Sequence, residues 1–210
     1  MDDTLEIRWF APGPPPSHVI DWITNLGAES ESNRTDLYLL SDDPAMNVKF
    51  REGQLQTKHR IGDGNVVRVN ERVSGKRERW TKWSFPLDDD APNLIKSDPT
   101  GLWVPVHKQR LQIRFNPDEQ IERLRDANLT VSEPDPVDAL AELTVVRSGD
   151  TVSWTVNAES EGTPERLTST LDQIVRLFFA APTISLETSA SFGYAEWLRS
   201  VVQPETVDAR

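Results

Sequence analysis

The sequence predicts an α+β fold, an antiparallel β-barrel or tunnel with peripheral helices. About eight or nine segments alternate apolar and polar residues with the period of two that is typical of strands, and about three or four segments predict helices. Nearly all connections between the expected strands are short, and short connections require antiparallel pairing. Closure into a barrel removes the exposed edges of such a sheet, so we expect the sheet to be closed or nearly closed.

The N-terminal part of the chain predicts a strand, a helix and a second strand. Thr4–Phe10 alternates apolar and polar residues and is expected to form the first strand. Ser17 is a good N-cap for a short helix at His18–Leu26. We then expect a polar loop at Glu29–Asn33 and a strand at Thr35–Leu40.

The middle of the chain predicts a run of antiparallel strands. Glu52 and Gly53 indicate a compact hairpin turn, and other polar turns separate the remaining strands. The expected strands are Met46–Arg51, Leu55–Arg60, Val66–Val73, Arg77–Phe85 and Val106–Phe115. The acidic, proline-containing stretch Pro86–Pro105 is expected to be a loop.

The C-terminal part combines a hairpin with helices, and we expect it to belong to the same single domain, residues 1–210. Glu142–Val146 and Thr151–Ala158 are expected to pair with each other. Other expected elements are a short helix at Pro117–Arg125, a polar linker at Asp126–Pro136, a helix from Pro164 to about Phe179, and a short helix at Tyr194–Val201. The last two make up a helical segment at 163–201.

Composition excludes several classes of protein. The chain has no cysteine, which excludes disulfides, thiolate metal sites and a cysteine nucleophile. The acidic N-terminus leads into no apolar segment of a signal peptide, and no apolar run approaches the length of a membrane span. We therefore expect a cytoplasmic protein that binds no membrane. The net charge of −11 argues against general nucleic-acid binding.

The charge is unevenly distributed along this acidic chain. Residues 46–85 hold ten Lys or Arg and four Asp or Glu, and residues 107–114 add three cations without an acid. In strands, residues two apart point to the same side, so these cations are expected to share faces of neighbouring strands. The candidate phosphate-binding residues are Lys49, Arg51, Lys58, Arg60, Lys108 and Arg110, and Arg77 and Arg79 share a further face.

Such a cationic face repels itself unless an anion lies within it. Phosphate suits the face because Arg offers paired donors and Lys a compact charge. The alternative is an ordinary sheet face in contact with water.

Three carboxylates are candidates for metal binding. Glu6 lies in the first expected strand, and Glu142 and Glu159 lie in the late hairpin. Carboxylates among cationic strands can bind Mg²⁺ or Mn²⁺ together with phosphate oxygens. They can equally be salt-bridge partners of the neighbouring cations, and the residues alone favour salt bridges.

Six short segments occur in the same order along the chain as the motifs of a known protein family. They are Thr35–Ser41, Val48–Gly53, Leu55–Lys58, Val106–Arg110, Glu142–Val146 and Tyr194–Leu198. In this order they resemble the CYTH superfamily, the triphosphate tunnel metalloenzymes, and Val48–Gly53 is similar to the family's Leu-Arg-Ile-Arg-x-x-Gly strand and turn. The resemblance implies an antiparallel tunnel whose lumen binds the phosphates of organic or inorganic triphosphates together with a divalent metal.

The first strand departs from the family's Glu-x-Glu-x-Lys signature. The matching residues of this chain are Glu6, Arg8 and Phe10. Arg8 reverses the charge of a metal-binding glutamate, and Phe10 replaces the lysine. A guanidinium is always charged, so we expect triphosphatase activity to be weak or absent.

We therefore predict that the basic tunnel binds a small phosphorylated ligand that bears a triphosphate. The resemblance adds Mg²⁺ or Mn²⁺ as cofactor and metal-dependent triphosphate hydrolysis as the reaction. Two alternatives stay open. The first is a catalytically degenerate tunnel that binds the ligand without turnover, which Arg8 favours. The second is a β-rich interaction protein whose basic face docks an acidic partner.

Overall fold

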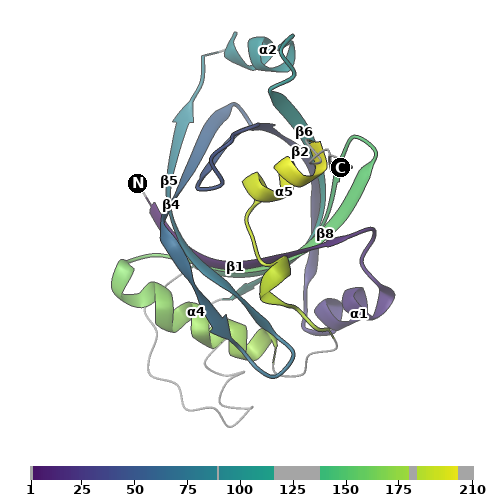
Figure 1. Cartoon of the computed structure of the whole chain (residues 1–210), viewed down its shortest axis with the longest axis vertical. Helices are drawn as coiled ribbons and strands as arrows, with labels where there is room; N and C mark the ends of the chain where they lie inside the picture. Colours follow the sequence, from purple (N-terminus) through teal and green to yellow (C-terminus); the bar gives the residue numbers. More distant parts are fainter. Residues whose placement is uncertain (1, 89, 116–137, 180–183, 203–210) are drawn as a thin grey trace, which may run out of the picture.

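Eight antiparallel strands form a closed barrel, which confirms the predicted fold class (Figure 1). A computed structural model describes residues 2–88, 90–115, 138–179 and 184–202. The strands are β1 (Asp2–Pro12), β2 (Glu29–Leu39), β3 (Met46–Arg51), β4 (Gln54–Arg68), β5 (Ser74–Pro86), β6 (Trp103–Phe115), β7 (Asp138–Ser148) and β8 (Thr151–Glu161). Around the barrel they follow the order β1-β5-β4-β3-β2-β6-β7-β8.

The helices lie around this barrel and at its end (Figure 1). They are α1 (Ser17–Asn25), α2 (Ala91–Lys96), α4 (Pro164–Phe178) and α5 (Tyr194–Val202), with a short 3-10 helix at Thr188–Ala190. Helix α4 begins with Pro164 at a first-turn position, where the missing N–H group is not needed. None of the helices described here is long and apolar enough to cross a membrane.

Two expected elements were wrong in type. Glu29–Asn33 belongs to strand β2 and is not a loop, because Glu29 pairs with Gln112 of β6. The loop expected at Pro86–Pro105 contains helix α2 and the start of β6. The helix expected at Pro117–Arg125 and the linker at Asp126–Pro136 lie outside the described residues.

Strand β4 replaces two expected strands, Leu55–Arg60 and Val66–Val73. The chain continues through an irregularity between Ile61 and Asn65 and pairs with β5 on both sides of it. Gly62 and Gly64 stand within this irregularity with φ values of 74° and 75°. Glycine reaches this left-handed region without steric cost, so the strand can bulge and resume pairing.

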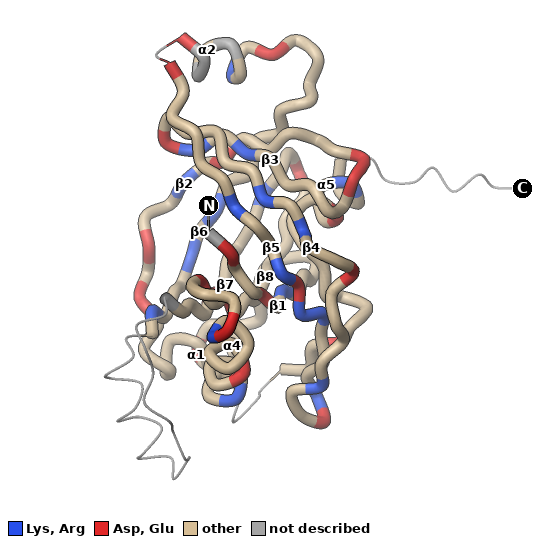
Figure 2. The backbone as a smooth tube through the Cα atoms, turned by 90° about the vertical axis from the view of Figure 1, so that its left-hand side faces the viewer, with Lys and Arg blue, Asp and Glu red and all other residues tan. Residues whose placement is uncertain are grey.

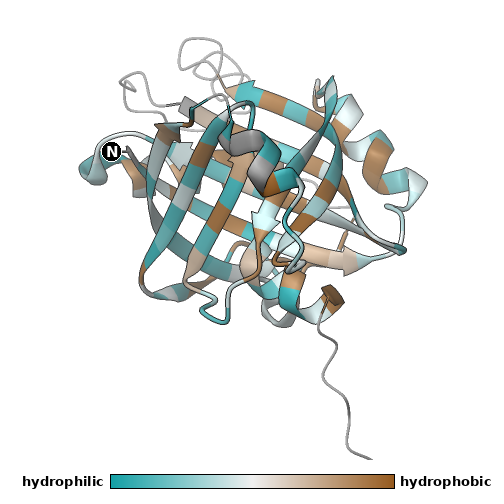
Figure 3. Cartoon of the chain, turned by 90° about the horizontal axis from the view of Figure 1, so that it is seen from above, coloured by the Kyte–Doolittle hydropathy of each residue, from teal (hydrophilic) through white to brown (hydrophobic). Residues whose placement is uncertain are grey.

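The main apolar core lies outside the barrel wall, beneath the helices. Apolar and polar residues alternate along the strands (Figure 3). On β1, Leu5, Ile7 and Trp9 share one face, and this face points outward because it packs against α4. They belong to one buried cluster with the apolar face of α4, including Leu171 and Ile174. Burial of this face fixes which side of each strand points into the barrel.

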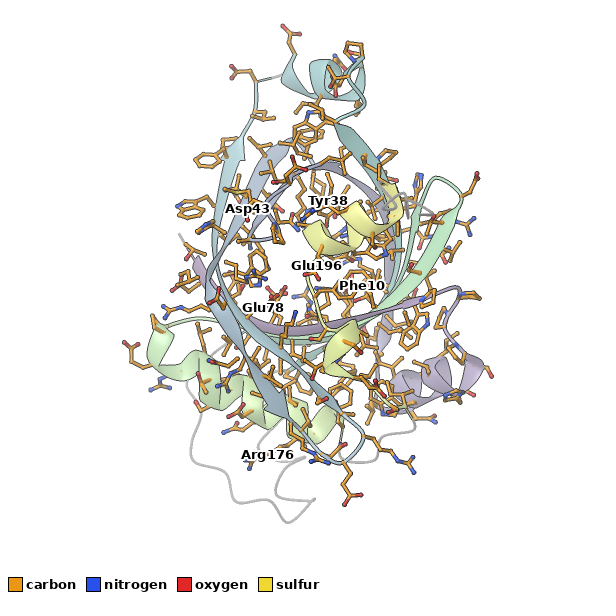
Figure 4. The ribbon with its side chains drawn as sticks, in the orientation of Figure 1. Phe10, Tyr38, Asp43, Glu78, Arg176 and Glu196 are labelled. Carbon is orange, nitrogen blue, oxygen red and sulfur yellow. The ribbon has the colours of Figure 1, made fainter. Side chains whose placement is uncertain are left out.

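A second apolar cluster fills one end of the barrel. It joins the strand residues Phe10, Tyr38, Val104, Val106 and Val146 to Tyr194, Trp197 and Leu198 of α5. The ring of Phe10 stacks on that of Trp197 with centroids 5.4 Å apart. Figure 4 shows Phe10 and Tyr38 beside α5 within the ring of strands. Helix α5 therefore closes this end of the lumen.

Candidate functional site

The remaining lumen holds a polar cavity of about 390 Å³. All eight strands and α5 contribute to its wall, which includes nine Lys or Arg and five Glu. The cationic residues are Arg8, Arg34, Lys49, Arg51, Lys58, Lys82, Lys108, Arg110 and Arg114. Figure 2 shows Lys and Arg recurring along neighbouring strands. The wall thus has an excess of four positive charges inside a protein of net charge −11.

The structure brings most of the sequence candidates together in this cavity. Lys49, Arg51, Lys58, Lys108 and Arg110 line it, as do the carboxylates Glu6, Glu142 and Glu159. The face that these strands share is therefore the interior of the barrel, not a water-covered outer face. Their roles as ligands of phosphate or metal stay predictions.

Arg60 is absent from the residues that line this cavity. Its Nη1 donates to Glu78 Oε1 at 2.6 Å, and its guanidinium lies 5.9 Å from the centre of the Trp80 ring. Arg77 also lies apart from the cavity, since it forms an ion pair with Asp172 of α4 on the outer wall.

One side of the cavity gathers cations around a single buried carboxylate. Asp36 of β2 is fully buried. Lys108 Nζ lies 3.0 Å from Asp36 Oδ2, Arg34 Nε lies 3.3 Å from Oδ1, and Lys49 Nζ lies 3.8 Å from Oδ2. Burial alone would raise the pKa of Asp36, but Lys108, Lys49 and Arg34 hold it at about 2. We call Arg34, Lys49, Arg51, Lys108 and Arg110 the basic cluster.

Burial and mutual repulsion lower the pKa of three cations of the basic cluster, although Arg110 Nη2 also lies 3.9 Å from Glu31 Oε2. Burial lowers the pKa of Lys108 to about 8, and Asp36 offsets only part of this effect. Burial, followed by repulsion from Lys108, lowers the pKa of Lys49 well below its ordinary value. The pKa of Arg110 is lowered by burial and by Arg34. These shifts mean that the charged forms of these side chains are less favourable in free energy here than in water.

Two tyrosines lie against the basic cluster. Lys108 Nζ donates to the Tyr38 hydroxyl at 2.7 Å and lies 4.0 Å from the centre of the Tyr194 ring. The Arg8 guanidinium lies 4.8 Å from the same Tyr194 ring. Tyr194 belongs to α5, so the helix that closes the barrel also forms part of the cavity wall.

A second set of residues in the cavity gathers carboxylates around two internal cations. Lys58 Nζ donates to Glu159 Oε1 at 2.8 Å and to Glu6 Oε2 at 3.4 Å. Burial would lower the pKa of Lys58, but Glu159 and Glu6 raise it. Burial would likewise raise the pKa of Glu142, but Arg8 lowers it. We call Glu6, Glu142 and Glu159 the carboxylate cluster.

These carboxylates, as arranged, do not fit a divalent metal. Across residues 2–88, 90–115, 138–179 and 184–202, no group of three or more His, Cys, Asp or Glu side chains is placed to hold a metal ion. Glu6 and Glu159 share Lys58, and Glu142 accepts hydrogen bonds from Thr144, at 2.6 Å, and from Gln112. Ion pairs with Lys58 therefore describe the present contacts of Glu6 and Glu159, whereas Glu142 is held by hydrogen bonds from neutral side chains.

Several lining residues were not among the sequence candidates. Arg34 fell next to the expected polar loop, and no local signal distinguished it from a surface residue. Tyr194 lies far along the chain on a helix, and only the closure of the barrel brings it to β6. Gln112 and Asn157 were detectable in principle, because each has the strand parity of a cation or carboxylate that lines the cavity.

No protein-family model matches the sequence, and neither does any curated protein. Among solved structures, the PH1819 protein of Pyrococcus horikoshii OT3 is similar, with 12% identity and a TM-score of 0.46, over 94% of this chain and 99% of that one. The PH1012 protein of the same organism is also similar, with 13% identity and a TM-score of 0.41, over 89% of this chain and 94% of that one. At these values neither structure informs the function of this chain.

Proposed function

We propose that this protein binds a small molecule bearing a di- or triphosphate in the basic cluster of its lumen and does not hydrolyse it. The observation that supports this most is the convergence of the five cations of the basic cluster on one cavity, where burial also lowers the pKa of Lys49, Lys108 and Arg110. Buried like charges with one fully buried carboxylate between them are unfavourable in the free protein. A polyanion placed among them would relieve that repulsion.

The chemistry of the basic cluster suits a chain of phosphates. Arg34, Arg51 and Arg110 each offer paired N–H donors, which match phosphate oxygens, and the two lysines add compact charges. Arg110 Nε is buried and has no hydrogen-bond partner within the described part of the chain, whereas Arg34 Nε and Arg51 Nε lie in ion pairs with Asp36 and Glu52. A cavity of about 390 Å³ is in the usual size range of a small-molecule site.

Binding without turnover follows from the carboxylate cluster. Metal-assisted phosphoryl transfer needs carboxylates that are free to hold a cation against the phosphate. Here Glu6 and Glu159 accept hydrogen bonds from Lys58. The resemblance to the triphosphate tunnel metalloenzymes supports a triphosphate ligand, and Arg8 in place of a glutamate supports the loss of hydrolysis. Docking of an acidic protein is less favoured, because the basic cluster faces inward.

Tripolyphosphate binding is expected to weaken as the pH rises through about 8, the pKa of Lys108. A bound phosphate favours the charged lysine, so the ligand binds less well once this lysine is neutral, with a loss of at most about tenfold per pH unit for one proton. The measurement is calorimetric titration with tripolyphosphate in EDTA, below and above this pH.

Lys108→Arg is the control, because arginine stays charged throughout this range. Ionisation of the ligand affects parent and variant equally. The affinity of the parent should therefore fall more steeply with pH than that of the variant, because Lys108 loses its charge and the arginine does not. Equal pH profiles for the two proteins would remove Lys108 from the site, and no binding at either pH would refute the proposed function.

A further inference from the structure

The carboxylate cluster lies around two side-chain cations at the centre of the molecule. Glu6 and Glu159 are direct cross-strand partners on β1 and β8, as are Arg8 and Asn157 two residues further along. Glu142 of β7 pairs with the same Asn157 from the other side. Arg8 is 8% exposed and Glu142 is 7% exposed. With Glu6, Glu159 and Lys58, these residues bring five charged groups to one part of the cavity wall.

Arg8 is held there by charge more than by hydrogen bonds. Arg8 Nη1 donates a hydrogen bond to Thr155 Oγ1 at 3.3 Å. Burial would lower the pKa of Arg8, but Glu6, Tyr194 and Glu142 raise it. Arg8 stands two residues after Glu6 on β1 and directly opposite Asn157, which in turn pairs with Glu142, so its guanidinium lies among the strands that carry these carboxylates and balances part of their charge. A metal ion takes such a position in other proteins.

An independent feature also points to a cation at this place. Asn157 is 1% exposed and lines the cavity. Its Oδ1 has no hydrogen-bond partner among the residues that the structure describes, and the same is true of Gln112 Oε1 beside Glu142. Buried amide oxygens without a donor are unusual, and amide oxygens are good ligands for hard cations.

We propose that Arg8 and Lys58 are resident counter-cations that exclude divalent metal from the lumen, and that the carboxylate cluster with Asn157 is a latent divalent-cation site. Three carboxylates against two cations leave one net negative charge. Removal of either cation leaves two, which a single divalent ion would neutralise. The inference rests on this cluster alone and not on phosphate binding.

The test is direct binding of Mn²⁺, followed by the loss of the free-ion electron paramagnetic resonance signal, with no phosphate present. The parent should bind Mn²⁺ in the lumen only weakly. Arg8→Gln keeps most of the side-chain volume without the charge, and Lys58→Met does the same for the lysine. Each should bind one Mn²⁺ per chain, on the order of a hundredfold more tightly than the parent, because one positive charge close to the site is gone.

Two matched variants locate the effect. Arg79→Ala removes one arginine on the outer wall, where it pairs with Asp3, and should gain no Mn²⁺ site. Adding Glu142→Gln to Arg8→Gln should abolish the site that Arg8→Gln creates. A variant that folds only when Mn²⁺ is present would also support the proposal.

The inference is overturned if the parent binds Mn²⁺ as tightly as the variants do. It is equally overturned if the folded variants bind no more tightly than the parent, if Arg79→Ala gains as much as they do, or if a misfolded variant is not rescued by Mn²⁺. Because the probe is the metal alone, failure here leaves the phosphate proposal standing, and failure of phosphate binding leaves this inference standing.

Discussion

Replacement of Asp36 by asparagine is expected to destabilise the fold by about 3–5 kcal/mol, the usual cost of breaking a buried ion pair on one side. Asp36 is fully buried and is the shared counter-ion of Lys108, Arg34 and Lys49. The asparagine has nearly the same shape, so the loss comes from charge and not from packing. Urea denaturation of parent and variant at neutral pH measures the difference.

The control for Asp36 is Asp21→Asn, a change at an exposed position of α1 that should alter stability by no more than about 0.5 kcal/mol. Tripolyphosphate should stabilise Asp36→Asn more than the parent, because the anion replaces the lost charge. A loss below about 1 kcal/mol would show that the basic cluster needs no internal counter-ion, against the pattern expected for buried pairs.

The same carboxyl predicts the behaviour of the fold in acid. The pKa of Asp36 is held at about 2 in the folded protein, below its ordinary value of 3.8. Its contribution to stability is therefore complete above the ordinary pKa and is lost as the pH falls towards 2. Asp36→Asn should remove this part of the acid sensitivity, which the same denaturation experiment can follow.

Trp197→Ala should cost about 3–5 kcal/mol, as for other large aromatic side chains removed from a core. Trp197 of α5 is buried, stacks on Phe10 and donates from Nε1 to Ser153 Oγ at 3.2 Å. It thus attaches the closing helix to strands β1 and β8. Thermal or urea unfolding measures the loss.

Val202→Ala, at the exposed end of the same helix, is the matched control and should change stability by no more than about 0.5 kcal/mol. Loss of Trp197 should also weaken tripolyphosphate binding, because Tyr194 on the same helix lies against Lys108. A folded Trp197→Ala protein with unchanged stability would contradict the role of α5 as part of the core.

The interior of the barrel could be predicted where strand parity was unambiguous. Lys49 and Arg51 on β3, and Lys108 and Arg110 on β6, alternate with apolar or neutral residues, so one face of each strand is clearly cationic. Closure of the barrel places those faces together. The alternation with a period of two is a local property of each strand. The sequence alone was therefore enough to predict which face of these strands carries the cations.

The same pattern was misleading on β5, where both faces carry charge. Arg77 and Arg79 were grouped with the other cations, whereas the residues with inward parity are Glu78 and Trp80. The choice between these faces depends on register, since Arg79 pairs with Leu5 of β1, whose side chain faces α4. The register between strands so far apart in sequence is set by the whole barrel. It cannot be predicted from the sequence of either strand alone.

The role of Arg8 was only half visible in the sequence. Its place in the first strand showed that a positive charge enters the lumen. Of the groups that surround it, Glu6 lies two residues earlier on the same strand, whereas Glu142 of β7, Glu159 of β8 and Tyr194 of α5 come more than a hundred residues later. Because these groups converge on Arg8 in the folded barrel, its positive charge lies among carboxylates instead of standing alone in the lumen.

Titration of tripolyphosphate into the parent, Arg110→Ala and Arg79→Ala, all in EDTA, tests the central claim most directly. Arg110 lines the cavity, whereas Arg79 pairs with Asp3, and both variants lose one positive charge. The parent and Arg79→Ala should bind one ligand per chain with equal affinity, and Arg110→Ala should lose about 1.5–3 kcal/mol of binding free energy, the value of a charge-assisted hydrogen bond. Absence of binding in EDTA, or an equal loss in both variants, would contradict a metal-independent phosphate site in the lumen.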